Sequence, residues 1–502
     1  MTGLRQALGK LWHAPDDAQM VRQDDRWWSW GEVRTLAENI DAELRKAGAV
    51  EGARVGVVLG NRMESVAALL ALLGNGRTVV TLNPMQPMGR VAADLAGARP
   101  RVVLAPESYW REEEFADVTT QLGIAGFVLG ADGIRRRSDE PPTADGGADE
   151  LAGSVAVEMF TSGTTGTPKR VPLTWRQLDA ALSAVHGHTG AARPDREPLT
   201  GRVGIVTLAI VHIGGMWAVL QALAEARPFV LLPRFTVERW VSAIEEHQPR
   251  IASLPPAAMR SVLNAEVPAE RLASLRAVSA GTTFVSPDLA EEFTTRYGIP
   301  VLIMYGATEF SGAIAGWTKP MHAQWWRAKR GSVGRPFPGV EVRAVDDDGE
   351  PAAAGTTGRL EVRSGQTGGA GWLRTNDLAH IDSDGFLYID GRADDAIIRG
   401  GFKIQPEVVA DALRSHESVL DATVYGRPDE RLGQVPVAVV ELVETAGSID
   451  EEELKAFTRD RLTAYEVPVT IHVVDELPRS ASLKVDRRRL LEMVSAREEA
   501  TA

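Results

Sequence analysis

The chain has 502 residues, more than one typical domain, and its 44% hydrophobic and 25% charged residues are typical of a globular protein. Its formal net charge of −13 argues against nucleic acid as the main partner, because phosphate backbones require a basic protein face. The absence of cysteine excludes disulfides, thiolate metal sites and a cysteine nucleophile. Residues 1–12 show no apolar leader, so we expect a cytoplasmic protein.

Short apolar runs alternate with helical patterns through the first 305 residues. Residues 63–73 and 89–95 have helical patterns, and each follows a strand-like run. Alternation of this kind predicts parallel sheets covered by helices. The strand-like runs are 54–59, 78–82, 101–105, 229–232, 251–254, 277–280 and 301–305. Residues 132–150 are rich in Gly, Asp, Pro and Arg and are expected to form an exposed connection.

Residues 159–169 combine hydroxyls, glycines and one lysine in a single predicted loop. Glycine lets a backbone approach an anion closely, while N–H groups, hydroxyls and a lysine supply donors and positive charge. Lys169 is followed by Arg170 and not by Ser or Thr, so the run is not the P-loop of the NTPases. The run predicts a polyphosphate-binding loop, and the alternative is a polar surface turn.

Residues 203–224 carry no formal charge and are long enough to cross a bilayer. His212, Gly214, Gly215 and Gln221 interrupt this stretch. The pattern therefore favours a buried strand over 203–211 followed by a helix, and we expect no membrane span.

The pattern changes twice after residue 330. Residues 331–392 show short strands separated by Gly and Asp turns, which predicts a small β-rich subdomain. After Ala393 the pattern restarts as a compact α+β unit of about a hundred residues. We therefore expect an α/β protein with a large N-terminal domain over 1–393 and a small α+β domain over 394–502.

Four further motifs follow the glycine-rich run. They are Tyr305-Gly306-Ala307-Thr308-Glu309, the run from Trp372 to Asp377, the run from Gly391 to Asp395, and the run from Pro478 to Lys484. In this order the set resembles the acyl-adenylate-forming superfamily, which includes acyl- and aryl-CoA synthetases, adenylation domains of nonribosomal peptide synthetases and beetle luciferases. The resemblance extends from Trp28 to Lys484 and is strongest to the acyl-CoA synthetases.

The resemblance implies a reaction in two halves. A carboxylate attacks the α-phosphate of ATP to give an acyl-adenylate and pyrophosphate, and CoA then takes the acyl group. A small C-terminal domain is expected to rotate between the two halves about a hinge at Asp394. The implied ligands are ATP, Mg²⁺, CoA and a small carboxylic acid, and the protein is expected to be a monomer or homodimer.

The resemblance also assigns residues to ATP and the metal. Asp377 is expected to bind the ribose hydroxyls and Arg392 to support ribose and phosphates, with Glu309 and Thr161 at the Mg²⁺. Tyr305 is expected to stack on adenine. The remaining predicted ATP contacts are Ser162, Gly163, Thr164, Thr165, Gly166, Lys169, Gly281, Thr282, Thr283, Gly306, Ala307 and Thr308.

Lys484 is the predicted catalytic residue that bridges the carboxylate and the α-phosphate. The other residues expected to take part in catalysis are Glu309, Thr308 and Lys403. The loop that would face the thiol acceptor is Gly400-Gly401-Phe402.

The acyl pocket is expected beside His212, together with Met216, Trp217, Gly281 and Gly306. Amino-acid-activating members of the superfamily place an Asp near the His212 position, but this chain has no Asp from Gly201 to Thr236. The expected substrate is therefore an aryl or aliphatic acid without an α-amine.

Three positions depart from the family pattern: Arg170, Asn376 and Leu483 each stand where glycine is common. Leu483 could restrict how Lys484 enters the site. One alternative is therefore an inactive protein that binds nucleotide or acyl groups. Another is an adenylating enzyme that passes the acyl group to a carrier-protein phosphopantetheine or to an amine.

Overall fold

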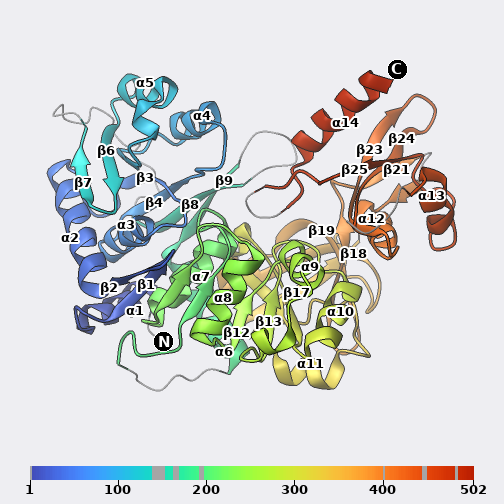
Figure 1. Ribbon diagram of the computed structural model, residues 1–502, viewed down its shortest axis with the longest axis horizontal. Coiled ribbons are helices and arrows are strands. Elements are labelled where there is room, and N and C mark those ends of the chain that lie inside the picture. Colours follow the sequence, from blue (N-terminus) through green and yellow to red (C-terminus); the bar gives the residue numbers. More distant parts are fainter. Residues whose placement is uncertain are drawn as a thin grey trace.

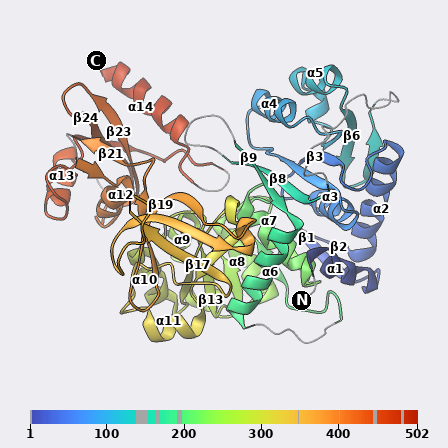
Figure 2. The ribbon, with the colours of Figure 1, turned by 180° about the vertical axis from the view of Figure 1, so that it is seen from behind.

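A computed structural model describes residues 3–137, 153–161, 169–190, 197–346, 348–399, 402–443, 449–480 and 484–501. Figure 1 shows a large body built from the N-terminal and middle parts of the chain, with the C-terminal part at one end of it. Figure 2 shows the same arrangement from behind, with helix α14 directed away from the body. The predicted α/β fold class is confirmed.

The largest sheet in the described part of the chain has seven strands. Its inner strands are parallel, and strands β7 and β9 pair antiparallel at its two edges. The strands in spatial order are β7 (Gly133–Arg136), β6 (Ala125–Gly130), β5 (Val102–Ala105), β3 (Arg54–Val58), β4 (Thr78–Leu82), β8 (Val155–Thr161) and β9 (Lys169–Thr174). Every residue of β3 and β4 is buried, as expected for parallel strands covered on both faces.

Two further sheets complete the middle of the body. The first is β12 (Ile251–Ser253), β13 (Ala277–Ala280), β14 (Val301–Ala307), β15 (Gly312–Gly316) and β16 (Arg335–Pro336), and its first three strands are parallel. The second is β10 (Gly204–Val206), β11 (Phe229–Leu231), β1 (Gln19–Gln23) and β2 (Arg26–Ser29).

The last two sheets are mainly antiparallel. One is the meander β17 (Val340–Val345), β18 (Gly358–Ser364), β19 (Leu373–Ile381) and β20 (Leu387–Arg392). The other begins after Arg392 and contains β21 (Ile397–Arg399), β22 (Phe402–Ile404), β23 (Val419–Asp429), β24 (Gly433–Leu442) and β25 (Thr470–Val474). The chain thus changes sheets between Arg392 and Ile397, close to the predicted boundary at Ala393.

Local sequence explains where several helices begin. Ser29 and Glu32 form a reciprocal capping box at the start of α2, and Thr174 and Gln177 do the same at α6. The helices are α1 (Leu4–Leu8), α2 (Trp30–Lys46), α3 (Met63–Gly74), α4 (Met88–Ala98), α5 (Glu113–Gln121), α6 (Trp175–Thr189), α7 (Ile213–Ala224), α8 (Val237–His247), α9 (Pro256–Asn264), α10 (Pro287–Tyr297), α11 (Lys319–Trp325), α12 (Pro406–Arg414), α13 (Glu451–Arg459) and α14 (Arg487–Thr501).

Two predictions of secondary structure need correction. Gly133–Arg136 is the edge strand β7 and not part of an exposed connection, because it completes a tight hairpin with β6. The strand predicted over 203–211 is shorter and ends at Val206, before a loop that leads into α7. Helix α7 is packed into the main core, and none of the helices in the described ranges is long and apolar enough to cross a membrane.

Candidate active site

The predicted phosphate loop is closed at its base by the hairpin of β8 and β9. The last pair in this ladder joins Thr161 to Lys169, so the two ends of the loop lie side by side. Ser162, Gly163, Thr164, Thr165 and Gly166 lie outside the described residues. Arg170 lies on β9 with a nitrogen 3.4 Å from Glu158, a buried carboxylate that also binds Arg54. This contact gives Arg170 a structural partner.

The carboxyl end of β14 carries the centre of the site. The Tyr305 hydroxyl donates a hydrogen bond to Asp377 Oδ2, although these residues are 72 positions apart. Asp377 on β19 lies opposite Arg392 on β20, and Arg392 Nη1 is 3.6 Å from Asp377 Oδ1. Burial and the neighbouring Asp377 raise the pKa of Tyr305 well above its usual value, so its hydroxyl stays a donor. Burial also raises the pKa of Asp377.

Lys484 reaches this centre from the C-terminal part of the chain. Its pKa is lowered by withdrawal from water and by Arg392, while Asp377 and Glu309 act in the opposite direction. The residue still keeps exposed surface, so the ammonium is only partly desolvated. The structure therefore brings Lys484 into the electrostatic environment of Asp377, Arg392 and Glu309.

His212 is the residue just before helix α7, and it lies close enough to Lys484 for the Lys484 charge to act on its ring. Its Nε2 atom is buried, and no hydrogen-bond partner for it exists within the described ranges. Burial and the positive charge of Lys484 lower the pKa of His212 to about 4. The imidazole is therefore neutral at neutral pH and can form a hydrogen bond with a bound ligand.

The neutral state of His212 has a consequence for stability. Its pKa is about 4 in the fold and about 6.5 in the unfolded chain, so the unfolded state binds more protons between these values. Stability should therefore fall as the pH falls, by about 2 kcal/mol through this residue between pH 7 and pH 5. Denaturant unfolding of wild type and His212→Gln at both pH values measures this, and equal pH dependence in the two proteins would contradict it.

The start of α7 packs against the loop after β13. A Cβ on Gly214 would lie 3.1 Å from Thr282 Cγ2, so the Thr282 side chain lies close to the Gly214 backbone. Thr282 has a φ of 70°, a left-handed conformation that is strained for a β-branched residue and clusters at functional sites. Trp217 is half-buried beside Gly312, whereas Met216 is completely buried in the main core. Trp217 can thus line a pocket, whereas Met216 is a core residue.

Two predicted glycines permit close approach between backbones. A Cβ on Gly281 would lie 2.7 Å from the Met304 carbonyl oxygen, and one on Gly306 would lie 2.3 Å from that of Gly312. Side chains at these positions would force β13, β14 and β15 apart. Ala307 and Thr308 follow at the end of β14 and the start of the next turn, with the exposed Glu309.

The predicted hinge is held by side chains in this conformation. Asp394 accepts hydrogen bonds from Arg392 Nε at 3.0 Å and Arg392 Nη2 at 2.8 Å. Asn376 Nδ2 also donates to Asp394, at 3.0 Å. The asparagine that replaces a common family glycine therefore links strand β19 to Asp394, the residue predicted as the hinge.

Phe402 is the one residue of the predicted acceptor loop that lies within the described ranges. Phe402 begins β22, at the edge of the C-terminal sheet, and its ring stacks on Tyr465 with centroids 4.6 Å apart. Lys403 is the next residue of this strand, while Gly400 and Gly401 lie outside the described residues, as does Leu483.

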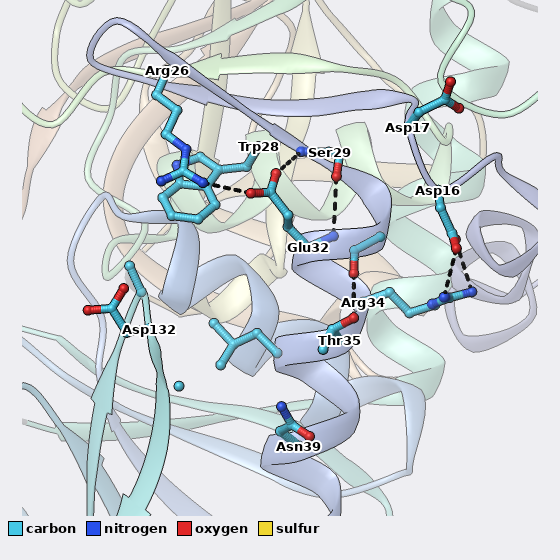
Figure 3. Close-up of a pocket in the computed structure, with 14 residues that line it drawn as sticks. Asp16, Asp17, Arg26, Trp28, Ser29, Glu32, Arg34, Thr35, Asn39 and Asp132 are labelled. Carbon is cyan, nitrogen blue, oxygen red and sulfur yellow. Dashed lines mark hydrogen bonds and ion pairs between the residues drawn. The ribbon is translucent and has the colours of Figure 1, made fainter.

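A separate groove of about 720 Å³ lies at the start of α2 (Figure 3). Its charged groups are mostly paired with each other, since Arg26 binds Glu32 and Arg34 binds Asp16. The Arg26 guanidinium also stacks over Trp28, 3.6 Å from the ring centroid. No residue predicted for the site lines this groove.

Comparisons with known proteins identify the family of the chain. A model of the AMP-binding enzyme family matches residues 11–369, and a model of the AMP-binding enzyme C-terminal domain matches residues 409–484. The chain therefore belongs to the AMP-binding enzyme family. It is 30% identical over 485 residues to a 2-succinylbenzoate–CoA ligase of Bacillus velezensis, covering 94% of both chains. It is 29% identical to an indoleacetate–CoA ligase of Aromatoleum aromaticum, covering 95% of both.

Solved structures show the same fold over nearly the whole chain. The amide bond synthetase McbA of Marinactinospora thermotolerans has a TM-score of 0.80 and 25% identity, covering 98% of this chain and 99% of that one. The o-succinylbenzoate–CoA synthetase of Bacillus subtilis, in complex with ATP and magnesium, has a TM-score of 0.77 and 25% identity, covering 97% and 99%. The family and its curated relatives place the chain among the AMP-forming acid–CoA ligases, which join an acid to CoA through an acyl-adenylate.

Sequence reasoning missed a network of ion pairs next to the Pro478–Lys484 motif. Asp421, Arg414 and Glu441 make ion pairs around Arg479, and Asp395 lies 3.2 Å from Arg487. No spacing rule links these positions, because their contacts join separate elements of the fold. The Pro478–Lys484 motif was the only sequence signal for this network, and of its residues the motif contains only Arg479.

Proposed function

We propose that this chain activates an aryl or aliphatic acid without an α-amine, using ATP and Mg²⁺, and transfers the acyl group to CoA. The observation that carries this proposal is the meeting of Tyr305, Asp377, Arg392 and Lys484 at the carboxyl end of β14. Ligands of open α/β sheets bind at this end of the strands.

The nucleotide contacts follow from this arrangement. Asp377 has lone pairs left after its bond with Tyr305, and these can accept hydrogen bonds from ribose hydroxyls. Arg392 holds Asp377 from the other side and adds positive charge near the phosphates. The loop that begins at Thr161 and ends at Lys169 supplies donors for the β- and γ-phosphates, and Thr308 lies toward the α-phosphate.

The donor set fits a magnesium ion that keeps phosphate and water ligands. Within the described ranges, no group of three or more His, Asp and Glu side chains could hold a metal by itself. Glu309 offers an exposed carboxylate, and Mg²⁺ is commonly bound by one or two carboxylates together with substrate phosphates. Glu309 and Thr161 would hold the ion, which when bound neutralises phosphate charge.

Lys484 stabilises the attack of the substrate carboxylate on the α-phosphate. Negative charge develops on the oxygens of the transferring group, and a positioned ammonium stabilises it more strongly in a partly desolvated site. The substrate supplies its own nucleophile, so the protein contributes position and charge. Lys403 and the loop from Gly400 to Phe402 then take part in acyl transfer, after the C-terminal part rotates about Asp394.

The acyl pocket lies between the start of α7 and the loop after β13. Neutral His212 can accept or donate one hydrogen bond to the acid, and Trp217 offers an apolar ring beside it. No Asp lies between Gly201 and Thr236 to pair with an α-ammonium. Relatives named for 2-succinylbenzoate and indoleacetate support an aromatic acid as the substrate.

Mass spectrometry of reactions with ATP, Mg²⁺ and a panel of acids, with and without CoA, tests this proposal. The panel should contain 2-succinylbenzoate, indoleacetate, benzoate and fatty acids, with phenylalanine as the α-amino control. We expect an acyl-CoA from at least one aryl or aliphatic acid and no adenylate from phenylalanine. Activation of phenylalanine alone would contradict the substrate class.

The second candidate is transfer to an amine, favoured by the likeness to the amide bond synthetase. The same reactions supplemented with a primary amine distinguish the two acceptors. Amide formation without any thioester would favour the amine, and adenylate without either product would favour a carrier-protein phosphopantetheine.

A further inference from the structure

Lys484 lies on a narrow hairpin in the C-terminal part of the chain. Ser480 N donates to the Lys484 carbonyl at 2.7 Å, Asp486 N donates to the Pro478 carbonyl at 2.7 Å, and Arg479 pairs with Val485 across the hairpin. The position of the Lys484 backbone therefore depends on the segment from Pro478 to Ser480, to which it is hydrogen-bonded.

That segment is fastened to the C-terminal sheet through Arg479. The Arg479 guanidinium makes a close ion pair with Asp421 Oδ2 on β23 and lies 3.6 Å from Glu441 Oε2 on β24. Glu441 Oε2 also accepts a hydrogen bond from Leu477 N, at 3.0 Å. Two carboxylates on neighbouring strands thus hold the base of the hairpin.

Asp421 is itself fixed from its other side. Arg414 Nε on α12 lies 2.8 Å from Asp421 Oδ1, and Arg414 also binds Glu407 at 2.6 Å. The side chains of Asp421, Arg414 and Arg479 expose only 20–22% of their surface. Burial acts to raise the pKa of Asp421, but Arg414 and Arg479 outweigh it and hold that pKa below its usual value.

Removing Asp421 would take away the carboxylate that both guanidiniums share, leaving Arg414 with Glu407 and Arg479 with the more distant Glu441. Loss of the close partner of a partly buried charge is costly, so we expect Arg479 to shift toward Glu441 and to move the hairpin with it. A shift of about 1 Å in a catalytic group can cost a hundredfold in rate.

We infer that Asp421 is a positioning residue for Lys484, acting through its ion pair with Arg479. This inference rests on the role proposed for Lys484 in adenylate formation. Asp421 is not among the residues proposed to contact substrate, and we expect its effect to be confined to the half-reaction in which Lys484 takes part.

The test compares Arg479→Met with Glu451→Gln. Arg479→Met removes the hairpin end of the network and leaves the pairs of Arg414 with Asp421 and Glu407 in place. Glu451 is a matched control in the same part of the chain, since it binds Lys455 at 2.8 Å and Ile471 N at 3.0 Å away from the hairpin. Pyrophosphate release measures adenylation, and acyl transfer is measured from supplied acyl-adenylate and CoA.

We expect Arg479→Met to lower the adenylation rate at least tenfold, with acyl transfer changed less than twofold. Glu451→Gln should change neither rate more than twofold. In a Lys484→Ala background, Arg479→Met should cause no further loss, because the two residues act in one unit. Asp421→Asn should behave as Arg479→Met does, and Arg479→Lys, which keeps the charge, should recover part of the rate.

Equal loss of adenylation and acyl transfer in Arg479→Met would show a purely structural network and overturn the inference. A further loss of adenylation when Arg479→Met is added to Lys484→Ala would overturn it as well. If Arg479→Met does not fold, Arg479→Lys carries the same test, with a loss of several-fold confined to adenylation. Full adenylation by Lys484→Ala alone would instead refute the proposed role of Lys484.

Discussion

Lys484→Ala is expected to lower the rate of acyl-adenylate formation by about 10²–10³-fold, the usual loss when one preorganised donor of charge stabilisation is removed. The substitution removes the ammonium that lies near Glu309, Asp377 and Arg392. ATP binding should change little, because the substitution leaves Asp377 and the loop between β8 and β9, the proposed ribose and phosphate contacts, unchanged. Rapid-quench measurement of adenylate and equilibrium titration with ATP separate the two effects.

The control for Lys484→Ala is Lys484→Arg, which keeps a positive charge on a longer, planar group. It should recover only part of the rate, since Arg and Lys differ in geometry and hydration. An adenylation rate equal to wild type in Lys484→Ala would remove Lys484 from the mechanism. A parallel loss of ATP affinity would make Lys484 a binding residue.

Asp394→Pro is expected to spare adenylate formation and to lower acyl transfer more than tenfold. Proline fixes φ near −65° and thereby limits the rotation about this position that is proposed for the second half-reaction. Single-turnover assays with ATP and acid, and then with supplied acyl-adenylate and CoA, measure the two halves separately.

The side chain of Asp394 requires its own control. It accepts two hydrogen bonds from Arg392 and one from Asn376, and Asp394→Pro removes these as well as the backbone freedom. Asp394→Ala removes the same contacts and leaves φ free, so it should retain acyl transfer within a few-fold of wild type. Equal loss of both half-reactions in Asp394→Pro would be inconsistent with a hinge at this residue.

Much of the fold was predictable because its signals are local. Strand β4 and strand β13 were predicted with the bounds that the structure has, and helix α3 differs by one residue. Short buried strands between helices produce apolar runs whose ends are marked by polar residues. Edge strand β7 was missed because it is short and polar, and it exists through pairing with β6.

The site was predictable in part. The motifs named Tyr305, Asp377, Arg392 and Lys484, and the structure brings these four together. The hydrogen bond between Tyr305 and Asp377 was not predictable, since it depends on how strand β19 lies against the end of β14. The same is true of His212 Nε2, which is buried without a hydrogen-bond partner in the part of the chain that the structure describes and which depends on the packing around α7.

The sequence by itself determined the class of chemistry. The hydroxyl- and glycine-rich run up to Lys169, the carboxylate of Glu309 and the motif ending at Lys484 are short-range patterns, and each carries its functional groups within a few residues. Such patterns specify the local backbone conformation and the functional groups of a segment, whatever its position in the fold.

Only the tertiary structure decided which distant charges share a site and what holds them there. The ion pair of Arg479 with Asp421 joins residues 58 positions apart, and Asp377 meets Arg392 through strand register. These distances depend on strand register and on packing between separate strands and helices. The pattern of apolar and polar residues within one strand or helix does not specify them. The ion pairs of Arg414 and Arg479 with the single carboxylate of Asp421 can therefore be recognised only in the folded chain.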